Sequence, residues 1–133
     1  MTAARKISEA ESMLVRLEEA SDEKISSELD SFLKVIHDVF SHLLDEYNIK
    51  FGCNIERIGL EKFKVKAKKT GNLEAINFLI WYEKEYKKLR DNPEFGRLLD
   101  KEQLTDTHVD IVRMCSNLLK ETKSMVFHAY ENF

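Results

Sequence analysis

The stretch ISSELDSFLKVIHDVFSHLLDEYNIKFG, residues 25–52, decides the fold class. Its apolar side chains recur every three or four residues from Ile25 to Tyr47, which is the spacing of one buried face of an α-helix. Ser21, followed by two acids, is typical of a helix N-cap, and Gly52 is typical of a helix end. A continuous helix of about 29 residues would be about 44 Å long, so it must pack along several partners.

The same spacing predicts helices in the rest of the chain. They cover about residues 3–20, the segment after Asn72, a short segment starting at Pro93, and about 25 residues near the C-terminal end. Residues 55–70 are ambiguous, because apolar residues there alternate with lysines as in a strand but also fit a helical face. Helix is favoured, since a lone strand would have no partner.

Composition agrees with a helical protein. The chain has 133 residues with only 4 glycines and 1 proline, so most turns of a many-stranded sheet are missing. The length suits one hydrophobic core. We therefore expect an all-α, up-and-down bundle of four long helices plus one or two short helices, forming a single domain over residues 1–133.

Composition also excludes several classes of protein. The longest apolar run, FLIWY, is too short to span a bilayer, and the first twenty residues lack the apolar core of an export signal. Cys53 and Cys115 form no Cys-x-x-Cys pair, so neither a zinc ribbon nor a disulfide framework is indicated. His37 and His42 do not share a helix face and are poor joint metal ligands. We expect a cytoplasmic protein with reduced thiols, no membrane association, no metal site and no cofactor.

Charge is distributed unevenly along the chain. Residues 1–50 carry 6 basic and 11 acidic side chains, whereas residues 51–90 carry 10 basic and 5 acidic ones. On a helix Lys62, Lys66 and Lys69 share one face, which could hold a phosphate backbone. The alternative is a solvated face that balances the acidic N-terminal third, either within the molecule or in a dimer.

The aromatic stretch NFLIWYEKEY also allows two interpretations. Phe78, Tyr82 and Tyr86 are four residues apart and could offer a platform on which bases stack. Such a pattern is also typical of a core or of a dimer seam. Trp81 lies on a neighbouring face, which makes the helix apolar over a wide arc and suggests self-association.

Two segments carry a resemblance to a known family. ELDSFLKVIHDVFSHLLDEYNIKFG, followed after a gap by NFLIWYEKEYKKLRDNPEFGRLLDK, resembles prokaryotic, especially archaeal, members of the HEPN superfamily (higher eukaryotes and prokaryotes nucleotide-binding) over residues 28–108. The resemblance implies an up-and-down helical bundle, commonly a homodimer, whose active members are metal-independent ribonucleases. Their signature is an arginine, usually followed by a polar residue, then four to six residues and a histidine.

The chain matches that signature only in part. Lys101 stands in the place of the arginine, Glu102 in that of the polar residue, and six residues separate Lys101 from His108. RNA cleavage through the 2′-hydroxyl needs a proton-transfer group, which His108 supplies, and a cation beside the phosphate. A lysine lacks the two-pronged grip of arginine, although Arg97 or Arg113 could substitute. The motif is therefore degenerate, and weak or absent ribonuclease activity is expected.

Two hypotheses about function follow. The first is a dimeric RNA- or nucleotide-binding module, with a nucleotidyltransferase protein as a further candidate partner. The second is a helical interaction or assembly module without a nucleic-acid role, in which the wide apolar helix and the complementary charge blocks serve assembly alone. The alternative to a nuclease site at His108 is structural: Thr105 or Asp106 caps the last helix and His108 lies in its first turn. The first requires the basic third of the chain to face the same cleft as His108, whereas the second does not.

Overall fold

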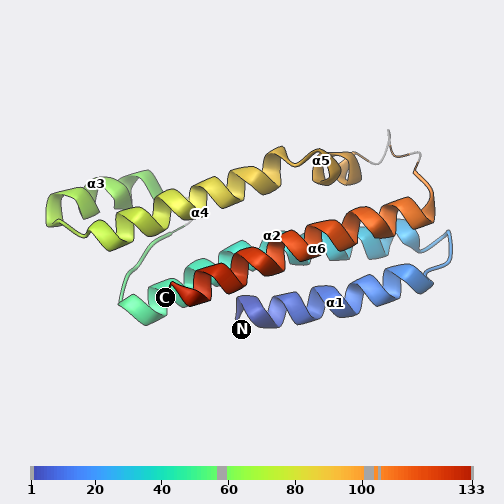
Figure 1. Cartoon of the computed structure of the whole chain (residues 1–133), viewed down its shortest axis with the longest axis horizontal. Helices are drawn as coiled ribbons and strands as arrows, with labels where there is room; N and C mark the ends of the chain where they lie inside the picture. Colours follow the sequence, from blue (N-terminus) through green and yellow to red (C-terminus); the bar gives the residue numbers. More distant parts are fainter. Residues whose placement is uncertain (1, 57–59, 101–103, 105, 133) are drawn as a thin grey trace.

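The computed structural model describes residues 2–56, 60–100, 104 and 106–132. Within these ranges the chain forms six α-helices and no strand, and the long helices run up and down (Figure 1). The helices are α1 (Ala3–Glu19), α2 (Ile25–Phe51), α3 (Leu60–Thr70), α4 (Leu73–Asp91), α5 (Pro93–Leu99) and α6 (His108–Glu131). The prediction of an all-α bundle with four long helices is confirmed. In the described part of the chain, every helix is too short or too polar to cross a membrane.

The ends of α2 show which local signals decide a helix boundary. Gly52 ends the helix in the left-handed conformation with φ of 63°, as expected for a C-terminal glycine. The predicted N-cap at Ser21 is wrong, because α2 begins at Ile25. The backbone carbonyl of Ser21 instead accepts hydrogen bonds from the N–H groups of Lys24 and Ile25, which closes a turn before the helix.

The second half of the bundle begins where the sequence predicted it. Residues 60–70 of the ambiguous segment form α3, while residues 57–59 lie outside the described residues. The Asn72 side chain accepts a hydrogen bond from the Ala75 N–H at 3.2 Å and caps α4. Asn92 caps α5 in the same way, with Pro93 in the first turn.

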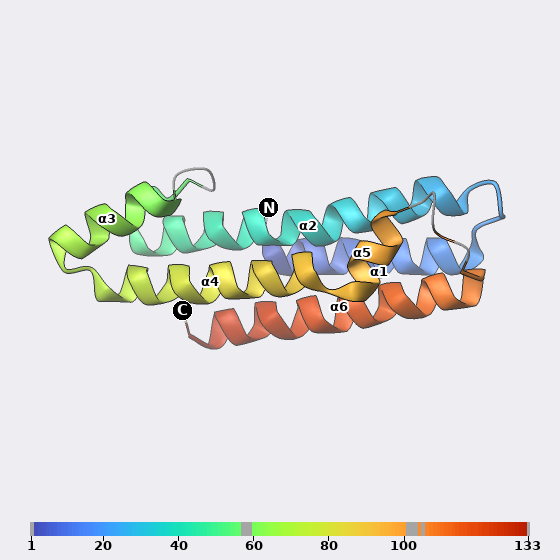
Figure 2. The ribbon, with the colours of Figure 1, turned by 90° about the horizontal axis from the view of Figure 1, so that it is seen from above.

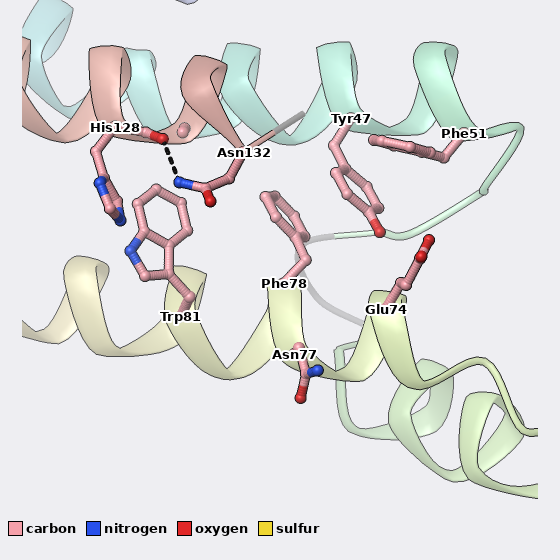
Figure 3. Close-up of a pocket in the computed structure, with 9 residues that line it drawn as sticks. Tyr47, Phe51, Glu74, Asn77, Phe78, Trp81, His128 and Asn132 are labelled. Carbon is pink, nitrogen blue, oxygen red and sulfur yellow. Dashed lines mark hydrogen bonds between the residues drawn. The ribbon is translucent and has the colours of Figure 1, made fainter.

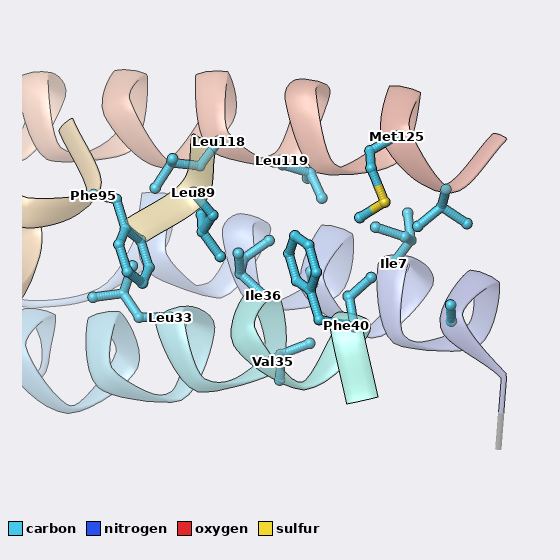
Figure 4. Packing of buried hydrophobic residues seen from close by; sticks show 14 of the residues in the cluster. Ile7, Leu33, Val35, Ile36, Phe40, Leu89, Phe95, Leu118, Leu119 and Met125 are labelled. Atoms are coloured by element: carbon cyan, nitrogen blue, oxygen red, sulfur yellow. The ribbon is translucent and has the colours of Figure 1, made fainter. Parts of the chain in front are cut away.

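Helices α1, α2 and α6 form the close-packed part of the bundle, and they lie side by side in both ribbon views (Figures 1 and 2). Ala3 and Ala10 of α1 are fully buried, and such small side chains allow the helix backbones to approach closely. Large apolar residues of α2, including Phe32 and Ile36, fill the space between these three helices. Figure 4 shows part of this core, where Phe40 of α2 lies among side chains of the neighbouring helices.

The N-terminus of α1 is fixed by groups from the other two helices. The Glu46 carboxylate accepts hydrogen bonds from the Ala3 N–H at 3.1 Å and from the Tyr130 hydroxyl at 2.7 Å. The Tyr130 hydroxyl in turn accepts the Ala4 N–H. Burial, together with the hydrogen bond to Glu46, raises the pKa of Tyr130 to about 12. Backbone donors that a helix start leaves unpaired are thus satisfied by α2 and α6.

Helix α4 joins α2 through aromatic rings. Phe78 stacks on Tyr47 with ring centroids 3.7 Å apart and planes at 5°. The Tyr82 hydroxyl donates a hydrogen bond to the Phe40 carbonyl at 2.9 Å, and Tyr86 packs edge-on against the Phe40 ring. The aromatic stripe of α4 is therefore a seam inside the bundle. This agrees with the interpretation that these aromatic residues belong to the protein core.

Candidate functional site

His108 is the first residue of α6 and is half-buried against the end of α1. Its Nε2 lies 2.6 Å from the carbonyl oxygen of Leu17. Because a carbonyl oxygen only accepts hydrogen bonds, Nε2 carries a proton and donates it to this contact. Leu17 is in the last turn of α1, and its carbonyl also accepts the backbone N–H of the C-cap residue Ala20 at 3.3 Å. His108 therefore caps the C-terminal end of α1.

The start of α6 differs slightly from the prediction. The cap is Thr107, whose hydroxyl oxygen accepts the Asp110 N–H at 3.2 Å. It is therefore neither Asp106 nor Thr105, and the latter lies outside the described residues. His108 does lie in the first turn, as the structural alternative to a nuclease site expected.

Three basic residues were predicted to lie beside His108. Two of them pair with carboxylates, and the third lies outside the described residues. Lys101, the residue in the arginine position of the resemblance, lies outside the described residues. The Arg97 guanidinium forms an ion pair with the Asp106 carboxylate at 2.7 Å, and Arg113 pairs with Asp110 at 3.4 Å. Each of these arginines thus faces a carboxylate. No pairing of His108 with a cation is seen within residues 2–56, 60–100, 104 and 106–132.

The predicted lysines lie at the opposite end of the molecule. Figures 1 and 2 both place α3 at one end and the start of α6 at the other. Lys62, Lys66 and Lys69 are exposed on α3, and Val65, with 54% of its surface exposed, lies among them. We call these four residues the basic stripe, because positions 62, 65, 66 and 69 share one helix face. The basic stripe and His108 do not share a cleft.

The lysines of α3 differ in their partners. Lys64 turns towards α4 and forms an ion pair with Glu83 at 2.7 Å, and this hydrogen bond raises the pKa of Lys64. The three lysines of the basic stripe have no ion pair with any residue that the structure describes. A cleft of about 510 Å³ adjoins the stripe, and its lining includes Lys62, Lys66 and residues that follow α2. Exposed positive charge is therefore concentrated on α3.

An acidic surface that we did not predict residue by residue lies at the other end. Val15, Glu18 and Glu19 are exposed near the end of α1, and Asp22 follows in the turn to α2. We call these four residues the acidic stripe. Its three carboxylates have no ion pair within the described ranges. The run of acids around the end of the predicted first helix, with Glu18, Glu19 and Asp22 within five residues, was the signal that could have revealed it.

A separate cleft of about 540 Å³ separates α4 from the C-terminal parts of α2 and α6 (Figure 3). Phe78 and Trp81 point into it from α4, and the Trp81 ring lies 6.0 Å from the ring of His128. At its other end Glu74 faces the hydroxyl of Tyr47. Burial, with smaller contributions from Cys53 and Glu74, raises the pKa of Tyr47. The cleft has aromatic walls and a carboxylate but no lysine or arginine in its lining, so it offers no permanent positive charge to a phosphate group.

Neither metal binding nor thiol chemistry is indicated by the described residues. They contain no group of three or more His, Cys, Asp or Glu side chains that could hold a metal ion. Burial raises the pKa of the Cys115 thiol to about 12, which keeps it in the unreactive protonated form.

Comparison with protein-family models, with curated proteins and with solved structures finds no match to this chain. The resemblance to the HEPN superfamily therefore stays a prediction.

Proposed function

We propose that this chain is a non-catalytic helical assembly module that associates with further copies of itself through its charged ends. The observation that carries the proposal is the placement of opposite charges. The basic stripe and the acidic stripe lie at opposite ends of an elongated bundle, and neither has a partner among the described residues of its own chain. Charges that cannot meet within one molecule can meet between two.

The position of His108 supports a non-catalytic role. A general base must reach the proton that it removes, and a cation must stand beside the same phosphate. The Nε2 of His108 is instead used to cap α1, and the basic stripe lies at the far end of the bundle. Arg97 and Arg113 each have a carboxylate partner.

The test is the mass of the protein in solution at several salt concentrations. Sedimentation analysis at low ionic strength is expected to give a multiple of the chain mass of 15.6 kDa, and added salt is expected to shift the population towards the single chain, because salt screens exposed charges. A protein of single-chain mass at low salt and high concentration would contradict the proposal.

A second function, binding of single-stranded RNA, is favoured by one observation. The three exposed lysines of the basic stripe lie on one helix face without carboxylate partners in the described part of the chain, as a surface for phosphate groups would require. Fluorescence anisotropy with a labelled single-stranded RNA tests it. Binding that falls with salt and is abolished by replacing Lys62, Lys66 and Lys69 with glutamate would favour RNA. Absence of binding at low salt would leave the assembly function alone.

A further inference from the structure

The cleft shown in Figure 3 lies apart from the two charged stripes and has four aromatic side chains in its lining, Tyr47, Phe51, Phe78 and Trp81. Phe78 stacks on Tyr47, and the ring centroids of Phe78 and Trp81 are 6.1 Å apart, so the rings form a nearly continuous wall. The volume of about 540 Å³ is typical of a site for a small molecule. The cleft is therefore large enough for a ligand and mostly aromatic.

The charge of the lining favours a cation. Among the described residues of the lining, Glu74 supplies the one carboxylate, and there is no lysine or arginine. Glu74 has no ion pair with any residue that the structure describes. Aromatic rings attract cations as well. Lys50, outside the lining, already places its Nζ 5.8 Å from the centroid of the Phe51 ring.

The ends of three helices meet at this cleft and act in the same direction. Phe51 is the last residue of α2, and Asn132 is the C-cap of α6. The C-terminal end of a helix carries a partial negative charge, which favours a bound cation. The N-terminal end of α4 has the opposite polarity, but Glu74 lies in its first turn and offsets it.

The spacing along α4 sets the shape of the ligand. Phe78 and Trp81 follow Glu74 by four and seven residues, so the three side chains share one face of the helix. At 1.5 Å per residue the two rings lie about 6 and 10 Å beyond Glu74 along the helix axis. A molecule whose ammonium group and aromatic ring are about 8 Å apart would contact the carboxylate and both rings at once.

We propose that this cleft binds an arylalkyl amine in its ammonium form. The ammonium group pairs with the Glu74 carboxylate, and the aromatic ring of the ligand packs against Phe78 and Trp81. This binding site goes beyond the proposed assembly function and does not depend on it.

Three probes of one shape and different charge test the proposal. They are phenylbutylammonium, the neutral phenylbutanol and the anion phenylpentanoate. Trp81 is the one tryptophan of the chain, so its indole N–H gives a single nuclear magnetic resonance signal inside the cleft. At about pH 8, where histidine side chains are largely uncharged, phenylbutylammonium is expected to shift this signal with a dissociation constant of about 1 mM. Phenylpentanoate is expected to leave it unchanged up to about 10 mM.

Glu74→Gln isolates the contribution of the carboxylate. Glu74 is exposed, so the fold is expected to stay intact, which circular dichroism checks. The variant is expected to bind phenylbutylammonium about fivefold more weakly, while its affinity for phenylbutanol stays within about twofold of the wild-type value. Glu23→Gln is the matched control, because it changes the net charge equally at an exposed position outside the cleft, and it is expected to leave both affinities unchanged.

Three results would overturn the proposal. The first is a Trp81 signal that none of the probes shifts. The second is equal affinity for phenylpentanoate and phenylbutylammonium, because the cleft would then not select positive charge. The third is a Glu74→Gln variant that binds phenylbutylammonium as tightly as the wild-type protein. Binding that is selective for the ammonium probe and depends on Glu74 supports the proposal. The assembly function is measured separately, by the mass in solution.

Discussion

The two sides of α2 are packed in different ways. On one side α1 and α6 approach α2 closely, with buried alanines of α1 at the contact. On the other side α4 is held at a greater distance by aromatic rings, with Phe78 on Tyr47 and Tyr82 below Phe40. A groove therefore opens along the α4 side, as the cleft at Trp81 and a second hollow between α4 and α6 show.

The comparison suggests that the three close helices carry most of the stability. Close backbone approach leaves few gaps, and core side chains there are shielded on all sides. On the α4 side, by contrast, the rings of Phe78 and Trp81 remain partly exposed. We expect α4 to open at a lower free-energy cost than α2 or α6.

The largest expected effect is that of Phe32→Ala in the close-packed part. Phe32 has no exposed surface, so the substitution leaves a cavity and is expected to lower the free energy of unfolding by about 4 kcal/mol. Urea unfolding followed by circular dichroism measures it. A loss no greater than that of Phe78→Ala would contradict the difference between the two sides.

Phe78→Ala breaks the ring contact on the α4 side. Phe78 is half-buried, so the expected loss is about 2 kcal/mol, part of it from the stack on Tyr47. Hydrogen exchange is expected to speed up in α4 more than in α6. Ile80→Ala on the same helix is the control, because Ile80 is 55% exposed and its loss is expected to stay within about 0.5 kcal/mol. Equal acceleration of exchange in all helices would show that α4 does not open separately.

Signals that act over a few residues predicted most of the helix boundaries. Gly52, Asn72 and Asn92 end or cap helices as expected, because each acts on backbone groups within about four residues. Ser21 failed as an N-cap, since its carbonyl rather than its side chain is used in the turn before α2. The choice between these two uses is not encoded in the residue type.

The sequence pattern could not predict which distant segments would be in contact. Periodicity showed that α4 is apolar over a wide arc, but not that Tyr82 would face α2 while Trp81 would lie near α6. It placed His108 in the first turn of α6, but not beside Leu17, which is 91 positions earlier in the chain. The sequence also showed that residues 51–90 are rich in basic side chains. It could not show that these side chains lie far from His108, because that distance depends on how all the helices are arranged.

A smaller effect is expected from His108→Ala, which removes the cap of α1 from the close-packed side. The Leu17 carbonyl loses a hydrogen bond, so the free energy of unfolding is expected to fall by about 1 kcal/mol. His108→Gln is the matched control, because its amide N–H can still donate to this carbonyl, and a smaller loss is expected. Thermal unfolding of both variants measures the difference. Equal losses would show that the hydrogen bond contributes nothing.

The smallest expected effect on stability comes from modifying Cys53. The reactivity of the two cysteines also tests whether the close-packed helices are better protected than the segment after α2. Cys115 of α6 is fully buried, and burial raises its pKa to about 12, so only about one thiol in ten thousand is ionised at pH 8. Cys53 is half-buried in the segment that follows α2. A thiol reagent at pH 8 is expected to modify one cysteine per chain quickly, and both after denaturation.

Cys53→Ser and Cys115→Ala assign the fast reaction. Cys53→Ser is expected to abolish it, whereas Cys115→Ala is expected to leave its rate unchanged. Modification of Cys53 is expected to change the free energy of unfolding by no more than about 0.5 kcal/mol, because this thiol lies in the segment after α2 and is only partly buried. Rapid modification of both thiols in the native protein would mean that α6 opens as readily as the segment after α2. The close packing of α1, α2 and α6 would then not protect their shared core.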